Sequence, residues 1–162
     1  MKLEARFTSH GNRLFSLDGT ECPAEGAAVL DAAQCRPGAD IPPQGVLCIR
    51  LPWGQVGTED GGYNEEFLAA FRDFLKELEE QGRYAFIVPD GGSGGFPDGG
   101  LLAASMKHCA RRIKDCASVI GFAVPPAGDA SYFMEQLREK HAHYIFFSRD
   151  ESLLADGGIV RY

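Results

Sequence analysis

Short β-favouring runs alternate with longer amphipathic segments along most of this chain, and this alternation limits the fold more than any other feature. The apolar runs are Val46–Leu51, Tyr84–Val88, Val119–Val124 and Tyr144–Phe147, followed by a shorter one at Ile159–Val160. The helical patterns between them span Asn64–Gln81, Leu101–Cys116 and Asp129 to about Lys140. Such an order is typical of a parallel sheet with right-handed crossovers. We therefore predict an α/β fold with a parallel sheet of about four to five strands.

The segment from Asn64 to Gln81 carries the strongest helical pattern. Its apolar side chains recur at helical spacing and form one stripe: Phe67, Leu68, Phe71, Phe74, Leu75 and Leu78. Asn64 is a favourable N-cap, and Gly82 supplies a C-terminal stop.

The first 44 residues follow a different pattern. Apolar positions around Phe7 and Leu14–Phe15 flank the sequence His10-Gly11-Asn12, which predicts a β-hairpin. Residues 21–44 are rich in Pro, Gly and Ala, so we expect a wrapped connection with one brief helix at Ala27–Ala33. At 162 residues the chain is sized for a single domain, with the hairpin and connection in residues 1–44 and the sheet in residues 45–162.

Charge and composition disfavour several kinds of partner. A net charge of −7 argues against nucleic acid and anionic membranes, because phosphate-binding surfaces need clustered Lys and Arg. No apolar run approaches the roughly 20 residues of a membrane span, and the N-terminus lacks a signal-peptide core, so we expect a cytoplasmic protein. The five cysteines lack zinc-site spacing and are interpreted as reduced thiols, and we expect no metal and no cofactor.

Residues 89–100 read PDGGSGGFPDGG and lie between a predicted strand and a predicted helix. Sites of α/β proteins gather at this edge of the sheet. A Walker loop is not present because Leu101 follows Gly100, and the dinucleotide fingerprint fails at Pro97. Phosphate binding through backbone N–H groups remains open, but a loop whose glycines permit unusual φ angles is the favoured interpretation.

Several segments carry a more specific pattern: GVLCIRLPW (45–53), GGYNEEF (61–67), RYAFIVPD (83–90) and KDCASVIGFAVPP (114–126). Together they resemble the second to fourth βα units of cellulase-like (β/α)8-barrel glycosidases. Residues 11–26 are similar to the hairpin that precedes the first barrel strand in that family. The resemblance covers about half of a barrel, which needs about 250 residues.

The resemblance implies a glycosidase-like domain that has lost hydrolysis. Arg50 stands in an Arg-Leu-Pro-Trp motif, where the family has an Arg that supports the nucleophile. The family's Asn-Glu-Pro, whose Glu is the acid/base, corresponds here to Pro126-Ala127-Gly128, and the nucleophile strand has no evident counterpart. Retaining hydrolysis needs two carboxyl groups about 5 Å apart. We expect instead a binding site for carbohydrate, or another small polar ligand, at the C-terminal rim of the strands. Its candidate residues are Arg50, Trp53, Asp90 and Asp98.

Two other functions stay open. The first is a small active glycosidase or other hydrolase with relocated carboxylates, for which Asp90 and Asp98 are the catalytic candidates. Other carboxylates that follow predicted strands are Glu59, Asp60 and Asp129, and all of these residues also suit turns and caps. The second is a structural or assembly protein without a ligand.

Individual residues carry alternatives of their own. Trp53 either stacks on a sugar ring or plugs the edge of the sheet, and Arg50 is expected in a structural ion pair more than in ligand contact. His141 and His143 flank a predicted turn at the end opposite the expected site.

The number of strands also leaves the assembly open. Four or five strands cannot close an eight-stranded barrel, which leaves a half-barrel, an open flavodoxin-like sheet, or two copies that pair. Because exposed sheet edges promote association, we predict a homodimer that completes the sheet, or a rearranged sheet.

Overall fold

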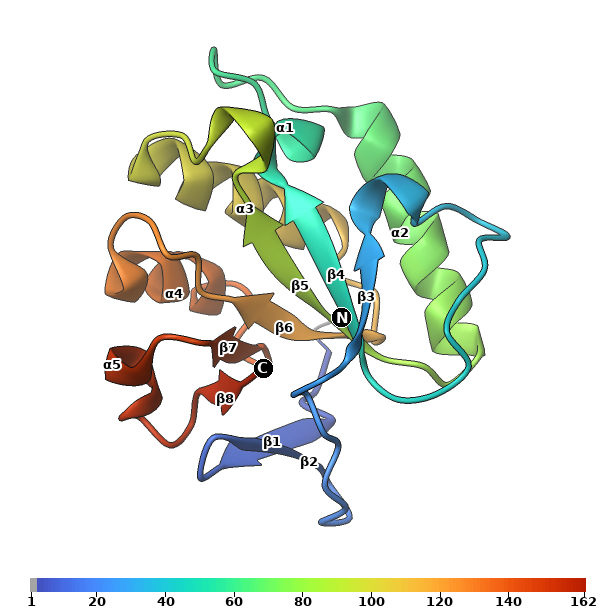
Figure 1. Ribbon diagram of the computed structural model, residues 1–162. Helices are drawn as coiled ribbons and strands as arrows, with labels where there is room; N and C mark the ends of the chain where they lie inside the picture. Colours follow the sequence, from blue (N-terminus) through green and yellow to red (C-terminus); the bar gives the residue numbers. More distant parts are fainter. Residues whose placement is uncertain (1–2) are drawn as a thin grey trace.

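The computed structural model describes residues 3–162 and contains a six-stranded parallel sheet preceded by a β-hairpin (Figure 1). The sheet strands are β3 (Ala28–Asp31), β4 (Leu47–Pro52), β5 (Ala85–Asp90), β6 (Val119–Ala123), β7 (Ile145–Ser148) and β8 (Val160–Arg161). They lie in sequential order from β3 to β8. The predicted α/β fold with its N-terminal hairpin is confirmed, and the sheet has six strands where about four to five were expected.

The hairpin consists of β1 (Phe7–His10) and β2 (Arg13–Ser16), which pair antiparallel. Its two-residue turn is Gly11-Asn12, and both residues have positive φ, +57° and +63°. A type I′ turn requires this conformation at both central residues, and Gly and Asn tolerate it best. The local sequence therefore determines this element.

All three long helices pack on the same face of the sheet. They are α2 (Glu65–Glu80), α3 (Gly99–Arg112) and α4 (Ala130–Arg138). Their buried side chains, including Phe71, Met106 and Leu137, share one core with Ile49, Ile87 and Phe122 of the sheet. A doubly wound sheet would carry helices on both faces, whereas one-sided helices with sequential strands match a segment of a (β/α) barrel.

The opposite face of the sheet, called the hairpin face below, has its own smaller core. Phe7, Leu14 and Ala24 from the hairpin region pack with Cys48 and Phe86 of the sheet. Figure 1 shows the hairpin near the end of the sheet where β4 and β5 begin. The C-terminal ends of the strands are thus left more open on this face, since Arg50 and Asp31 there are exposed.

Side-chain caps fix the starts of α2 and α4. Asn64 Oδ1 accepts a hydrogen bond from Phe67 N at 3.1 Å, and Asp129 Oδ1 accepts one from Tyr132 N at 3.1 Å. Both residues were predicted as caps, and these contacts confirm it. The shorter elements are α1 (Trp53–Val56), α5 (Glu151–Leu154) and the 3₁₀ turns η1 (Ala32–Gln34) and η2 (Gly92–Gly94).

The brief helix predicted at Ala27–Ala33 is wrong, because strand β3 occupies most of this segment. Its four residues pair in parallel with β4, from Ala28 opposite Leu47 to Asp31 opposite Arg50. Pairing with a neighbouring strand overrides the weak helical preference of an alanine-rich segment. The strand also presents Val29 and Asp31 to the hairpin face.

The two edges of the sheet differ in how they are covered. At the β8 edge, the hairpin turn forms hydrogen bonds with the backbone: Asn12 N donates to Gly157 O and Arg161 N donates to Asn12 O, each at 3.0 Å. At the β3 edge, Val29 is 55% exposed.

Within residues 3–162, every helix is too short or too polar to cross a bilayer. All five cysteines are free thiols, and four of them are buried.

Candidate functional site

Three charged side chains meet at the C-terminal ends of β3, β4 and β5 on the hairpin face. Arg50 Nη2 donates to Asp90 Oδ2 at 3.0 Å, and Asp31 is the register partner of Arg50 on the next strand. The side chains of Arg50 and Asp90 are 52% and 31% exposed, so solvent reaches the pair. We call Asp31, Arg50 and Asp90 the rim cluster.

Electrostatics keep Arg50 charged. Its hydrogen bond with Asp90 raises the pKa of the guanidinium, and the nearby charges of Asp90 and Asp31 act in the same direction. The ion pair uses Nη2, and a guanidinium has five N–H donors. The rim cluster therefore holds a cation between two carboxylates, with donors available beyond the ion pair.

A second arginine borders the hairpin face beyond the rim cluster. Arg149 Nε donates to Tyr162 O at 3.0 Å, and its guanidinium carbon lies 4.3 Å from the centroid of the Tyr162 ring. Tyr162 in turn packs edge-on against Phe86, with ring centroids 5.4 Å apart. Sequence reasoning missed Arg149, although its place two residues after the buried Phe147 puts it on this face.

Trp53 packs on the helix side of the sheet and anchors the glycine segment. Its Nε1 donates to Gly95 O at 3.2 Å, and its side chain packs against the helix-side core. This placement corresponds to the edge-plugging alternative.

The glycine segment folds back on itself as a loop. A Cβ on Gly91 would lie 2.7 Å from the carbonyl carbon of Gly95, and Gly92 and Gly95 have φ of +65° and +77°. These positions require glycine, as the favoured interpretation of the segment expected. Asp98 then precedes α3 at its N-cap position, where a carboxylate disfavours a bound phosphate.

In the part of the chain that the structure describes, Asp98 does not contact the other predicted site residues through a hydrogen bond or an ion pair. It is exposed, and no hydrogen bond or ion pair within residues 3–162 joins it to Arg50, Trp53 or Asp90. The structure thus brings together Arg50 and Asp90, adds Asp31, and leaves Trp53 and Asp98 in other roles.

Two of the other carboxylates after strands, Asp60 and Asp129, serve local structure. Asp60 accepts hydrogen bonds from the Thr58 hydroxyl and from Gly62 N, and the first of these is the main reason that the pKa of Asp60 is lowered. Asp129 caps α4. The loop at 126–128, where the resembling family has its acid/base, carries no carboxylate, and Gly128 lies close against Gly99.

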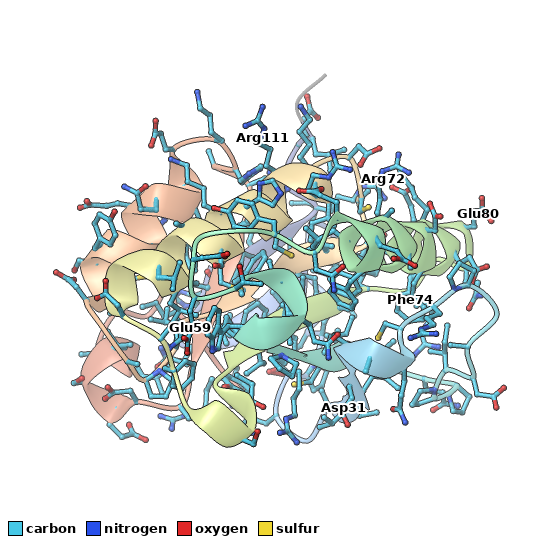
Figure 2. The ribbon with its side chains drawn as sticks, turned by 90° about the horizontal axis from the view of Figure 1, so that it is seen from above. Asp31, Glu59, Arg72, Phe74, Glu80 and Arg111 are labelled. Carbon is cyan, nitrogen blue, oxygen red and sulfur yellow. The ribbon has the colours of Figure 1, made fainter. Side chains whose placement is uncertain are left out.

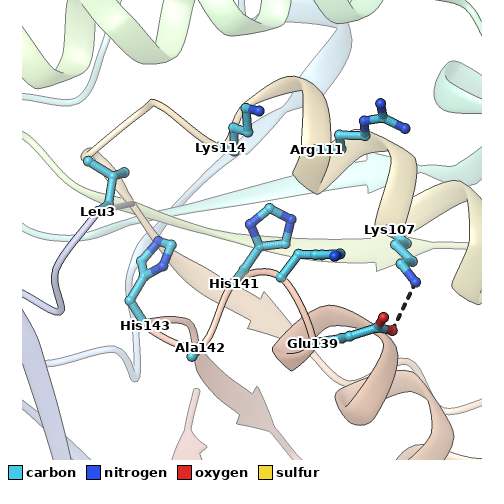
Figure 3. Close-up of a pocket in the computed structure, with 9 residues that line it drawn as sticks. Leu3, Lys107, Arg111, Lys114, Glu139, His141, Ala142 and His143 are labelled. Carbon is cyan, nitrogen blue, oxygen red and sulfur yellow. Dashed lines mark hydrogen bonds and ion pairs between the residues drawn. The ribbon is translucent and has the colours of Figure 1, made fainter. Parts of the chain in front are cut away.

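A separate cavity lies at the opposite end of the sheet, between α3 and the connection from α4 to β7 (Figure 3). Its volume is about 710 Å³, and its lining is Leu3, Lys107, Arg111, Lys114, Glu139, Lys140, His141, Ala142 and His143. We call it the basic pocket. Figure 2 shows Asp31 of the rim cluster and Arg111 of the basic pocket on opposite sides of the molecule.

Among residues 3–162, no three His, Cys, Asp or Glu side chains gather as ligands of a metal ion would. Comparison with protein-family models gives no match to this chain, and comparison with curated proteins gives none either.

Proposed function

We propose that this chain binds a small, uncharged carbohydrate at the rim cluster and does not hydrolyse it. The observation that carries this proposal is the Arg50–Asp90 ion pair on the open hairpin face, with Asp31 beside it. Sugar hydroxyl groups both donate and accept hydrogen bonds, so a guanidinium between two carboxylates offers complementary partners. Neighbouring strands hold these groups in a fixed spacing, which lowers the entropic cost of binding.

The spacing of the carboxylates argues against the retaining form of hydrolysis. Asp31 and Asp90 belong to strands separated by β4, so their backbones lie about 10 Å apart. Retaining glycosidases hold their two carboxyl groups about 5 Å apart. Arg50 extends between these two strands and bonds to Asp90, so one of the two carboxylates is held in an ion pair.

The experiment titrates a panel of oligosaccharides into the protein by calorimetry, with Trp53 fluorescence and an aryl-glycoside assay on the same sample. Arg50→Gln removes the cation of the rim cluster. Arg112→Gln is the matched control, because Arg112 forms a comparably exposed ion pair with Glu65 elsewhere. We expect saturable binding, weakened about tenfold or more by Arg50→Gln and unchanged by Arg112→Gln.

Two other outcomes of this experiment would support a different function. Turnover that disappears in Asp90→Asn and Asp98→Asn would establish a hydrolase with relocated carboxylates. Absence of any response to the panel would favour a structural or assembly role.

We also propose that two copies associate through the β3 edge. The support is the place of β3 at the end of the sheet, in contrast to the β8 edge, which the hairpin turn covers. An unpaired strand edge offers backbone hydrogen bonds to a second chain.

A further inference from the structure

The basic pocket concentrates positive charge in a chain whose net charge is −7. Four cationic side chains line it (Lys107, Arg111, Lys114 and Lys140), together with a single carboxylate, Glu139. Like charges gathered around one hollow repel each other, so the arrangement is unfavourable unless something compensates it.

Internal ion pairs compensate only part of this charge. Lys107 Nζ lies 3.2 Å from Glu139 Oε2, the contact drawn in Figure 3. Arg111, Lys114 and Lys140 form no ion pair with any side chain of residues 3–162. After Glu139 is paired with Lys107, the pocket retains three positive charges.

Two histidines form the inner wall of the pocket. His141 is 4% exposed, and Figure 3 shows it between the basic side chains of α3 and His143. His143 Nε2 is buried and has no hydrogen-bond partner. This nitrogen is enclosed by protein, so His143 lines the pocket with its other atoms.

A purely structural role would place cations here to complement the C-terminal ends of α3 and α4. Two neighbouring arginines fit this structural role, because each has a partner in the protein. Arg112, in the last turn of α3, pairs with Glu65 at 3.1 Å, and Arg138, in the last turn of α4, lies 4.9 Å over the Phe146 ring. Neither lines the pocket, whereas three of the four cations that do line it, Arg111, Lys114 and Lys140, have no ion-pair partner among residues 3–162.

We propose that the basic pocket binds the phosphate group of a small phosphorylated molecule. A phosphate dianion accepts several charge-assisted hydrogen bonds at once, and the arginine fork suits its geometry. Arg111, Lys114 and Lys140 supply the charge, and His141 and His143 line the same wall of the cavity. The volume of about 710 Å³ lies within the usual range for small-molecule sites. The site is independent of the rim cluster.

The test titrates inorganic phosphate and glycerol 3-phosphate into the full chain, followed by calorimetry and by the imidazole NMR signals. Two double variants change the net charge equally at the same helix ends: Arg111→Gln/Lys140→Gln inside the pocket, and Arg112→Gln/Arg138→Gln outside it. We expect binding to weaken about tenfold or more in the first and to change less than about twofold in the second.

The four histidines report the location of binding. We expect the signals of His141 and His143 to move on saturation while those of His10 and His108 do not, since His108 is held by Glu65 and Tyr63 outside the pocket. Saturation by either probe supports the proposal, and tighter binding of glycerol 3-phosphate identifies an organic phosphate as the better ligand. Equal weakening in both double variants, or saturation without movement of the His143 signal, would overturn it. So would a lack of saturation by either probe.

Discussion

Arg50 Nη2 lies 3.0 Å from Asp90 Oδ2, a contact that joins the ends of β4 and β5 on the open face of the sheet. Because solvent reaches both side chains, the pair adds little to stability. We expect Arg50→Gln to change the free energy of unfolding by no more than about 1 kcal/mol. Urea denaturation measures this change. A loss of several kcal/mol would show that Arg50 is needed for the fold, which would remove the variant as a test of binding.

Gly121 is required where β6 meets β7. A Cβ at this position would collide with the main-chain carbonyl of Ile145, its partner across the two strands. We therefore expect Gly121→Ala to lower the free energy of unfolding by about 3 kcal/mol or more. Gly54→Ala is the control, because a Cβ there meets no atom within 4 Å. Similar denaturation midpoints for the two variants would contradict this view of the strand pair.

His141 makes stability depend on pH in a defined range. Burial lowers the pKa of His141 to about 4 from 6.5, and the neighbouring His143, Lys114 and Lys107 act in the same direction. Between these values the unfolded chain binds more protons than the folded one. Stability is therefore fully present above pH 6.5 and falls as the pH drops towards about 4. The loss has an upper limit of about 3 kcal/mol.

The measurement is urea denaturation at several pH values within this range. Glu139 is the carboxylate facing this part of the pocket, and it is paired with Lys107. His141→Gln should flatten the pH dependence, leaving the part that comes from His143, whose pKa is also lowered by burial. An unchanged slope in His141→Gln would show that other groups control the acid response.

The β3 edge gives the test of association. Val29 is 55% exposed, so Val29→Lys should scarcely alter the fold while placing a charge on the edge strand. Light scattering after size exclusion should report a dimer for the original chain and a monomer for Val29→Lys. A monomer for both chains, across a concentration series, would contradict pairing through this edge.

Elements fixed by local chemistry could be predicted from the sequence. Helix α2 follows from its apolar period and its Asn64 cap, and the hairpin follows from Gly11-Asn12, where positive φ is required. Strand β3 could not be predicted in this way. Its four residues carry little strand preference, and their conformation results from pairing with β4.

The rim cluster and the basic pocket also differ in how far their residues could be predicted from the sequence. Arg50 could be predicted from the Arg-Leu-Pro-Trp motif of the family resemblance. Asp90 could be predicted because it follows an apolar run, and such strand ends gather at one edge of a parallel sheet. Asp31 was missed together with its strand. The basic pocket was missed because its residues belong to a helix end and a turn, so the cavity exists only once α3, Leu3 and the 139–143 segment pack together.

The most direct test of carbohydrate binding at the rim cluster is a calorimetric titration of the oligosaccharide panel into the original chain and into Arg50→Gln. We expect at least one oligosaccharide to bind the original chain saturably, and its affinity to fall about tenfold or more in the variant. Equal affinity for both proteins, or no binding to the original chain, would contradict carbohydrate binding at Asp31, Arg50 and Asp90.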